Sequence, residues 1–162
     1  ITFKPDHAYA YNNMGIALKE LGKLEEAIEA YIKTIALAPN SAEGYYNISN
    51  ALKTITLQKP NEALQNTIIS MLDRKRYVRP MAIARAAISL LKFEPTLQKH
   101  LKLVDNGIIE NPVDLISDLN ELTLLLKLMS VCPLPDLELE KLLKNLRNSI
   151  LSSILEIEHA SA

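Results

Sequence analysis

Residues 8–41 read AYAYNNMGIALKELGKLEEAIEAYIKTIALAPNS, and their pattern predicts the fold most clearly. The apolar residues of this stretch recur at spacings of three and four, which is the period of an amphipathic helix. Gly22 separates two such patterns, and Pro39 ends the second. The stretch therefore predicts two helices, over residues 8–21 and 24–37, joined by a tight turn in which Gly22 is left-handed.

The same pattern recurs when the sequence is compared with itself at an offset of 34 residues. Identical residues then coincide in these pairs: Ile1 and Ile35, Pro5 and Pro39, Ala8 and Ala42, Tyr11 and Tyr45, Asn13 and Asn47, Ala17 and Ala51, Leu18 and Leu52, Lys19 and Lys53. Because the coinciding apolar positions lie on one helix face, the sequence predicts a helical hairpin that is repeated along the chain.

The predicted buried face of the first hairpin contains small residues where two helices meet. It comprises Tyr11, Met14, Gly15, Ala17 and Leu18 in the first helix, and Leu24, Ala27, Ile28, Tyr31 and Ile35 in the second. Glycine in mid-helix costs about 1 kcal/mol relative to alanine. We therefore expect a neighbouring helix to approach closely at Gly15.

The spacing of these residues resembles the tetratricopeptide repeat. The matching positions are Tyr11, Met14-Gly15, Leu18 (in place of the usual tyrosine), Ala27, Tyr31 and Pro39, within a unit of 34 residues. The resemblance implies an all-α fold of helix–turn–helix repeats stacked into a superhelix. It also implies a module that binds a protein or peptide in the concave groove lined by the first helix of each repeat.

The predicted domains follow from the self-match and the resemblance. The repeat region, residues 1–73, comprises the tail of one repeat (1–7), a full repeat (8–41) and a degenerate repeat (42–73), in which Ser49 replaces the usual glycine. Residues 79–158 are predicted to form a C-terminal helical region without repeats, as a bundle or an irregular array. The chain starts within a repeat, which indicates a longer parent array whose exposed ends could support a homo-oligomer.

Prolines and capping residues predict the helices of the C-terminal region. We expect helices that begin at Pro80, after a cap at Thr96, and at Pro112, then an apolar helix over residues 121–131 and a long last helix capped by Asp136. The apolar helix should lie at the centre of a bundle, because it is apolar nearly all round. Asp105-Asn106-Gly107 predicts a turn.

Composition excludes several other classes of protein. The 162 residues are 48% hydrophobic with 5% aromatic residues, 4 Gly and no Trp, which disfavours sheet folds. A net charge of −1 makes nucleic acid an unexpected partner. No membrane span or signal peptide is expected. Cys132 is a lone cysteine, so no disulfide or cysteine metal cluster can form within the chain, and we expect a reducing compartment such as the cytoplasm.

The candidate binding site is the polar stripe opposite the buried face of each unit's first helix. We assign partner binding to Tyr9, Asn12, Asn13, Ile16, Lys19, Tyr46, Asn47, Asn50 and Lys53. Asparagine can both donate to and accept from a peptide backbone, and tyrosine offers rigid area with a polar tip. Some tetratricopeptide domains hold a terminal carboxylate with a Lys/Asn/Arg set. Asn47 fits that set, but Asn12 stands where lysine is needed and Ile16 where asparagine is needed.

The titratable residues do not form a recognisable catalytic, metal or cofactor site. We expect His7, His100 and His159 to be separate surface residues, and Cys132 to be a buried inert thiol. The acidic pairs Glu25-Glu26 and Glu138/Glu140 lie in the first turns of predicted helices, where they favour the helix dipole.

Two other functions stay open. Residues 61–157 resemble a linker region in bacterial multidomain proteins in which tetratricopeptide repeats precede an S-adenosylmethionine-dependent methyltransferase domain. The chain would then be a non-catalytic N-terminal fragment that positions a protein substrate. In addition, the basic run Arg74-Lys75-Arg76-Tyr77-Val78-Arg79 could contact an anion or RNA, although we favour a solvated loop at a helix end.

Overall fold

The computed structural model describes residues 5–74, 77–108 and 111–160, with side chains described from residue 7 to residue 152 in these ranges. Helices joined by turns and loops account for this part of the chain, and it contains no strand. The helices are α1 (Pro5–Glu20), α2 (Leu24–Leu37), α3 (Ala42–Leu52), α4 (Glu62–Asp73), α5 (Pro80–Leu91), α6 (Pro95–Asp105), α7 (Pro112–Asn120), α8 (Thr123–Val131) and α9 (Leu137–Ala160). The predicted all-α class is confirmed.

Local chemistry sets most of the helix boundaries. Proline occupies the first helical turn of α5, α6 and α7, where its missing N–H costs nothing. Side chains cap the starts of three other helices, where Ser41 accepts from the backbone N–H of Gly44, Asn61 from that of Leu64 and Asp136 from that of Leu139. Asn111 also caps α7, by accepting from the backbone N–H of Val113. The predicted cap at Thr96 was wrong, because Pro95 already begins α6 and Glu94 is the capping residue.

The first hairpin, α1 and α2, forms as the sequence predicts. A Cβ atom on Gly15 would lie 2.5 Å from Cε1 of Tyr31, which confirms that α2 approaches α1 too closely for a side chain there. Gly22 has a φ of 77°, so the left-handed conformation predicted for the turn is also confirmed. Ala27, Ile28 and Tyr31 are buried as expected.

The predicted buried face of α1 was only partly right. Gly15 is buried and Leu18 is half-buried, but Met14 is 47% exposed and Ala17 is exposed as well. The reason is that α1 packs mainly on α2 and only slightly on α3, and no other described helix covers its outer side.

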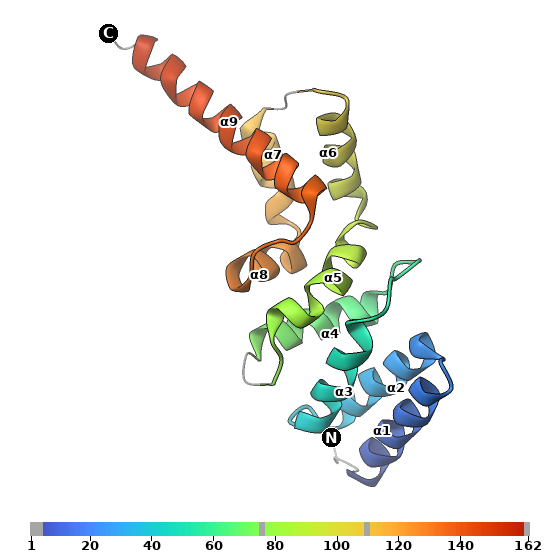
Figure 1. The fold of residues 1–162 in the computed structure, drawn as a ribbon. Helices are drawn as coiled ribbons and strands as arrows, with labels where there is room; N and C mark the ends of the chain where they lie inside the picture. The colour runs from blue at the N-terminus through green and yellow to red at the C-terminus, as the bar shows by residue number, and fades with distance from the viewer. Residues whose placement is uncertain (1–4, 75–76, 109–110, 161–162) are drawn as a thin grey trace.

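The helices α3 and α4 are arranged differently from α1 and α2. Helix α3 packs against α2 and α5, in the place expected for the first helix of a second repeat. Residues 53–61 then form a long connection, compared with residues 21–23 in the first hairpin. Helix α4 makes little contact with α3 and packs instead against α8, α5 and α2 (Figure 1).

The molecule is elongated, with α1–α3 at one end, α4 and α5 in the middle and α6–α9 at the other end (Figure 1). One continuous core of buried side chains extends from Ala27 in α2 to Leu142 in α9. It therefore crosses the predicted boundary between residues 73 and 79 without a break. Among the described helices, none combines the length and the apolar character needed to cross a membrane.

Helix α8 is not enclosed on all sides. Leu124, Leu125 and Leu128 are buried against α4, α5 and α7, but Leu126 and Met129 are 42% and 43% exposed. The expectation that this helix occupies the centre of a bundle was therefore wrong. The helices of this half form an irregular array that leaves one side of α8 uncovered by described residues. Gly107 has a φ of 71° and ends α6 in the predicted turn.

Candidate functional site

The predicted binding residues lie on α1 and α3, which are joined through a shared polar contact. Tyr9 and Tyr46 are 65% and 64% exposed. Asn13, Lys19 and Lys53 are exposed as well, whereas Ile16, Asn47 and Asn50 are half-buried. The structure thus leaves two large aromatic side chains and two lysines accessible on these helices.

Asn12 does not lie on the accessible surface that the sequence predicts for it. Its side chain is 3% exposed, and both ends of its amide are occupied. Nδ2 of Asn12 donates to Oε1 of Glu43 at 2.8 Å, and Oδ1 accepts from Nδ2 of Asn47 at 2.9 Å. Asn12 therefore joins α1 to α3, and its burial keeps the rest of the amide away from a partner.

Glu43 is a member of this site that the sequence reasoning missed. It lies in the first turn of α3, where a carboxylate favours the helix dipole, and it accepts the hydrogen bond from Asn12. The 34-residue offset could have found it, because Tyr9 falls on Glu43 and Asn13 falls on Asn47. The network formed by Asn12, Glu43 and Asn47 fixes the distance between the two helices.

A surface hollow of about 170 Å³ lies beside this network, between α1, the end of α2 and the start of α3. Its lining residues are Ala8, Tyr9, Asn12, Thr34, Ala38, Ser41 and Glu43. The hollow therefore combines apolar area with a carboxylate and the exposed ring of Tyr9. Further along α3, Nζ of Lys53 donates to Oδ1 of Asn50 at 2.8 Å, at the exposed end of the same stripe.

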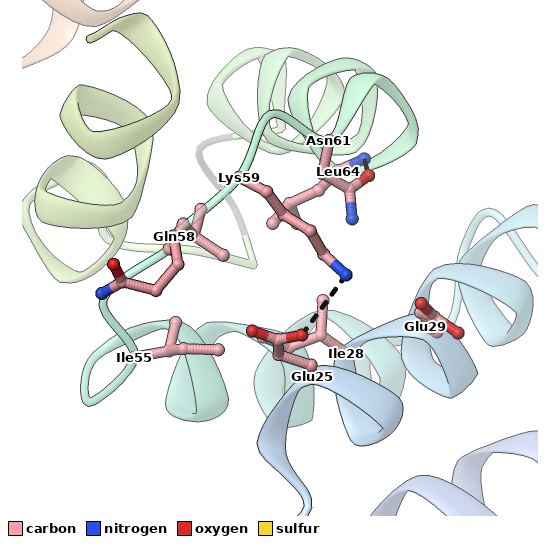
Figure 2. A pocket seen from close by; sticks show the side chains of 9 residues that line it. Glu25, Ile28, Glu29, Ile55, Gln58, Lys59, Asn61 and Leu64 are labelled. Carbon is pink, nitrogen blue, oxygen red and sulfur yellow. Dashed lines mark hydrogen bonds and ion pairs between the residues drawn. The ribbon is translucent and has the colours of Figure 1, made fainter. Parts of the chain in front are cut away.

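A second pocket lies between α2 and the connection that precedes α4 (Figure 2). It encloses about 20 Å³, which is room for about one water molecule. Lys59 reaches across it to Glu25 at 3.7 Å, and both side chains are more than half exposed. An exposed pair of this kind contributes little stability. The pocket marks where residues 55–61 lie over α2, and it is too small for a ligand.

The histidines differ from one another, contrary to the expectation of three surface residues. His7 is exposed, but the imidazole of His100 is fully buried and its Nε2 lies 2.9 Å from Oδ2 of Asp118. The same oxygen accepts from Nζ of Lys99 at 3.0 Å. Hydrogen bonds from Lys99 and His100 lower the pKa of Asp118. His159 lies outside the described side chains.

His100 and Asp118 act as a link between α6 and α7. Within the described part of the chain, His, Cys, Asp and Glu do not gather into a group that could hold a metal ion. Cys132 is 9% exposed, and burial raises the pKa of its thiol, which keeps the thiol in its unreactive protonated form.

The basic run contains an arginine with a defined structural environment. Arg74 is half-buried, and its Nη1 donates to Oδ1 of Asn40 at 3.1 Å. Its guanidinium lies 5.8 Å from the ring centroid of Tyr45, and Tyr77 stacks on the same ring with centroids 5.4 Å apart. Arg74 thus lies at the C-terminal end of α4, as expected, but it is half-buried against Tyr45 and not part of a solvated loop. Lys75 and Arg76 lie outside the described residues.

Together, the Gly15–Tyr31 contact and the left-handed turn at Gly22 define a helical hairpin of two closely packed helices, which is the building unit of helical-repeat proteins. Comparison with known families identifies the repeat: a tetratricopeptide repeat model matches residues 8–41, the same residues that the self-comparison marks as a full unit. Residues 8–41 of the chain are a tetratricopeptide repeat.

One curated relative adds a wider context. The human protein O-mannosyl-transferase TMTC3 is 32% identical to this chain over 118 residues, which cover 70% of the chain. The chain spans 12% of the length of that protein. No solved structure matches the chain significantly.

Proposed function

We propose that this chain is a scaffold that binds an extended segment of a partner protein along α1 and α3. The observation that carries the proposal is the pair of exposed tyrosines, Tyr9 and Tyr46, on either side of a rigid polar network. Tyrosine is enriched at binding hot spots because it buries a large area at a small entropic cost.

The network supports the proposal by preorganising the surface. Asn12 is buried and hydrogen-bonded to both Glu43 and Asn47, so α1 and α3 hold their spacing before a partner arrives. Binding to a preformed surface avoids part of the ordering cost that weakens flexible sites. Asn13, Lys19 and Lys53 are then the accessible polar groups that would select among partners.

A peptide ligand is first selected by peptide display on the purified chain. The affinity of this peptide is then measured for the wild type and for variants. Substitution of Asn13, Lys19 and Lys53 together by alanine leaves the Asn12 network intact and should weaken binding of the selected peptide at least tenfold, which is about 1.4 kcal/mol. Met81→Ala is the matched control, because Met81 is 55% exposed on α5, away from the groove. Equal affinities for the triple variant and the wild type would contradict the proposal.

A second candidate function is that the chain is a non-catalytic segment of a larger transferase. The support is the resemblance to a protein named O-mannosyl-transferase, of which the chain corresponds to 12%. A methyltransferase context, as the linker resemblance suggests, stays a prediction. The complete open reading frame is the test: a transferase domain in the same frame supports this function, and a frame without one contradicts it.

The cytoplasmic localisation and the homo-oligomer through exposed repeat ends also stay predictions. The buried thiol of Cys132 is compatible with a reducing compartment. Met14 and Leu21, which are 47% and 73% exposed in the first hairpin, provide apolar area for a contact between chains.

A further inference from the structure

Another surface hollow lies between α2 and α4. It shares no lining residue with the hollow beside the network of Asn12, Glu43 and Asn47. Its volume is about 290 Å³. It exists because α4 leaves α3 and crosses α2 instead of completing a second hairpin. Its lining includes Ile32 and Ile35 from α2, Asn66 and Ser70 from α4, and Arg74 at the end of α4.

The hollow has one positively charged end. Arg74 stands there without a carboxylate partner among the described residues, because its hydrogen bond goes to the neutral amide of Asn40. The adjacent carboxylate, Asp73, is paired with Lys127 on α8. A guanidinium carries five N–H donors in a planar fork. Some N–H donors of the Arg74 guanidinium therefore remain for an anion, and the contact with the ring of Tyr45 orients the guanidinium.

The side chains that line the hollow indicate which chemical group would bind next to the anion. Ile32 and Ile35 supply an apolar wall, and Asn66 and Ser70 supply polar groups that make no side-chain hydrogen bond to the described chain. A volume of 290 Å³ is at the lower end of the range for ligand pockets, so the hollow fits one or two side chains and not a whole cofactor.

We propose that this hollow binds a segment of a partner protein in which an acidic side chain adjoins an apolar one. The partner's carboxylate pairs with the guanidinium of Arg74, and the partner's apolar side chain packs on Ile32 and Ile35. Since the net charge of the chain is −1, attraction of an acidic peptide must come from this local arrangement and not from the field of the whole molecule. The site is independent of the groove on α1 and α3.

Fluorescence polarisation with two labelled peptides tests the proposal, one alternating leucine with glutamate and the other alternating leucine with glutamine. We expect the acidic peptide to bind at least tenfold more tightly than its neutral counterpart. Arg74→Gln should abolish this preference. Arg85→Gln is the matched control, because Arg85 is an exposed arginine on α5 that does not line the hollow, and it should retain the preference.

A second variant separates binding from folding, because Arg74 also contacts Asn40 and Tyr45. Ser70→Glu leaves those contacts intact and places a carboxylate in the hollow, so it should block the acidic peptide while the thermal unfolding midpoint stays unchanged. Tyr46→Ala should leave the affinity of the acidic peptide as it is, which distinguishes this site from the groove.

Three outcomes would overturn the proposal. The first is equal affinity for the two peptides. The second is an unchanged preference in a folded Arg74→Gln or Ser70→Glu variant. The third is an Arg74-dependent binding of a twelve-nucleotide oligouridine that is tighter than the binding of the acidic peptide, since this would assign the charge to nucleic acid.

Discussion

Gly15 determines how closely the first two helices pack. The ring of Tyr31 occupies the space where a side chain on residue 15 would project, and the ring itself is only 1% exposed. The sequence could predict this contact, because a glycine in mid-helix needs a packing reason. It could not predict the burial of Asn12, because the two partners of that amide come from α3, and a helical wheel of α1 does not include them.

Gly15→Ala should therefore destabilise the chain, although alanine is the better helix former. The gain in helix propensity is about 1 kcal/mol, whereas overpacking a well-filled site costs about 1–3 kcal/mol. The new methyl group would start only 2.5 Å from a ring that has no room to move. Urea denaturation followed by circular dichroism measures the difference.

Gly44→Ala is the matched comparison for this prediction. A Cβ atom there would lie 3.1 Å from Cγ2 of Thr34, which is a less severe contact. We expect the two variants to rank in that order, with Gly15→Ala the more destabilised. A Gly15→Ala variant that is more stable than the wild type would show that the helices do not approach as described.

Among the helices, local sequence patterns predict where helices begin and end, but they do not predict how the helices pack against one another. Pro80 and Pro112 begin their helices as predicted, by a purely local effect, and Pro95 begins α6 by the same effect although a cap at Thr96 was expected there. Which side of α8 is covered depends on α4 and α5, which are distant in sequence, as well as on the preceding helix α7, so the apolar pattern of α8 alone suggested a central helix. The departure of α4 from α3 is likewise a tertiary effect that the repeat pattern cannot contain.

The carboxylate of Asp136, directly before α9, should make the free energy of unfolding depend on pH. Burial alone would raise the pKa of the Asp136 carboxyl, but hydrogen bonds from Lys92 and from the backbone N–H of Leu139 outweigh it and lower that pKa. A depressed pKa in the folded state adds stability that is complete above the pKa of the unfolded state, and this stability is lost as the pH falls through the folded pKa.

Asp136→Asn keeps a capping side chain but removes the ion pair with Lys92. At pH 7 we expect the variant to lose about 0.5–1 kcal/mol of unfolding free energy, and the difference from the wild type should shrink below about pH 4. Glu140→Gln, at an exposed position of the same first turn, is the control. If the difference in unfolding free energy between the wild type and Asp136→Asn were the same at pH 7 and pH 2.5, this would contradict a lowered pKa of Asp136.

At the scale of the whole molecule, the continuous core joins the repeat to the C-terminal helices. All six tyrosines lie between residues 9 and 77, and the chain has no tryptophan, so tyrosine fluorescence reports on that half. Leu128 of α8 is fully buried in the same core as Tyr31 and Tyr45. The division of the chain at residues 73–79 is therefore open to a direct test of cooperativity.

Leu128→Ala should cost about 2–5 kcal/mol and should shift the tyrosine transition and the circular dichroism transition together. The reason is that α8 packs against α4 and α5, which connect it to α2 and α3. Urea titrations followed by both signals measure this. A tyrosine transition that stays in place while circular dichroism becomes biphasic would show two independently folding domains.

An amide chemical-shift map shows whether a partner segment binds along α1 and α3. A peptide selected on the chain is added to the ¹⁵N-labelled protein, and the shifts are assigned to residues. We predict that the largest shifts fall on residues 9–19 and 43–53, with the Tyr9→Ala, Tyr46→Ala double variant showing little change. Shifts concentrated on α6–α9, with that double variant still binding, would contradict the account.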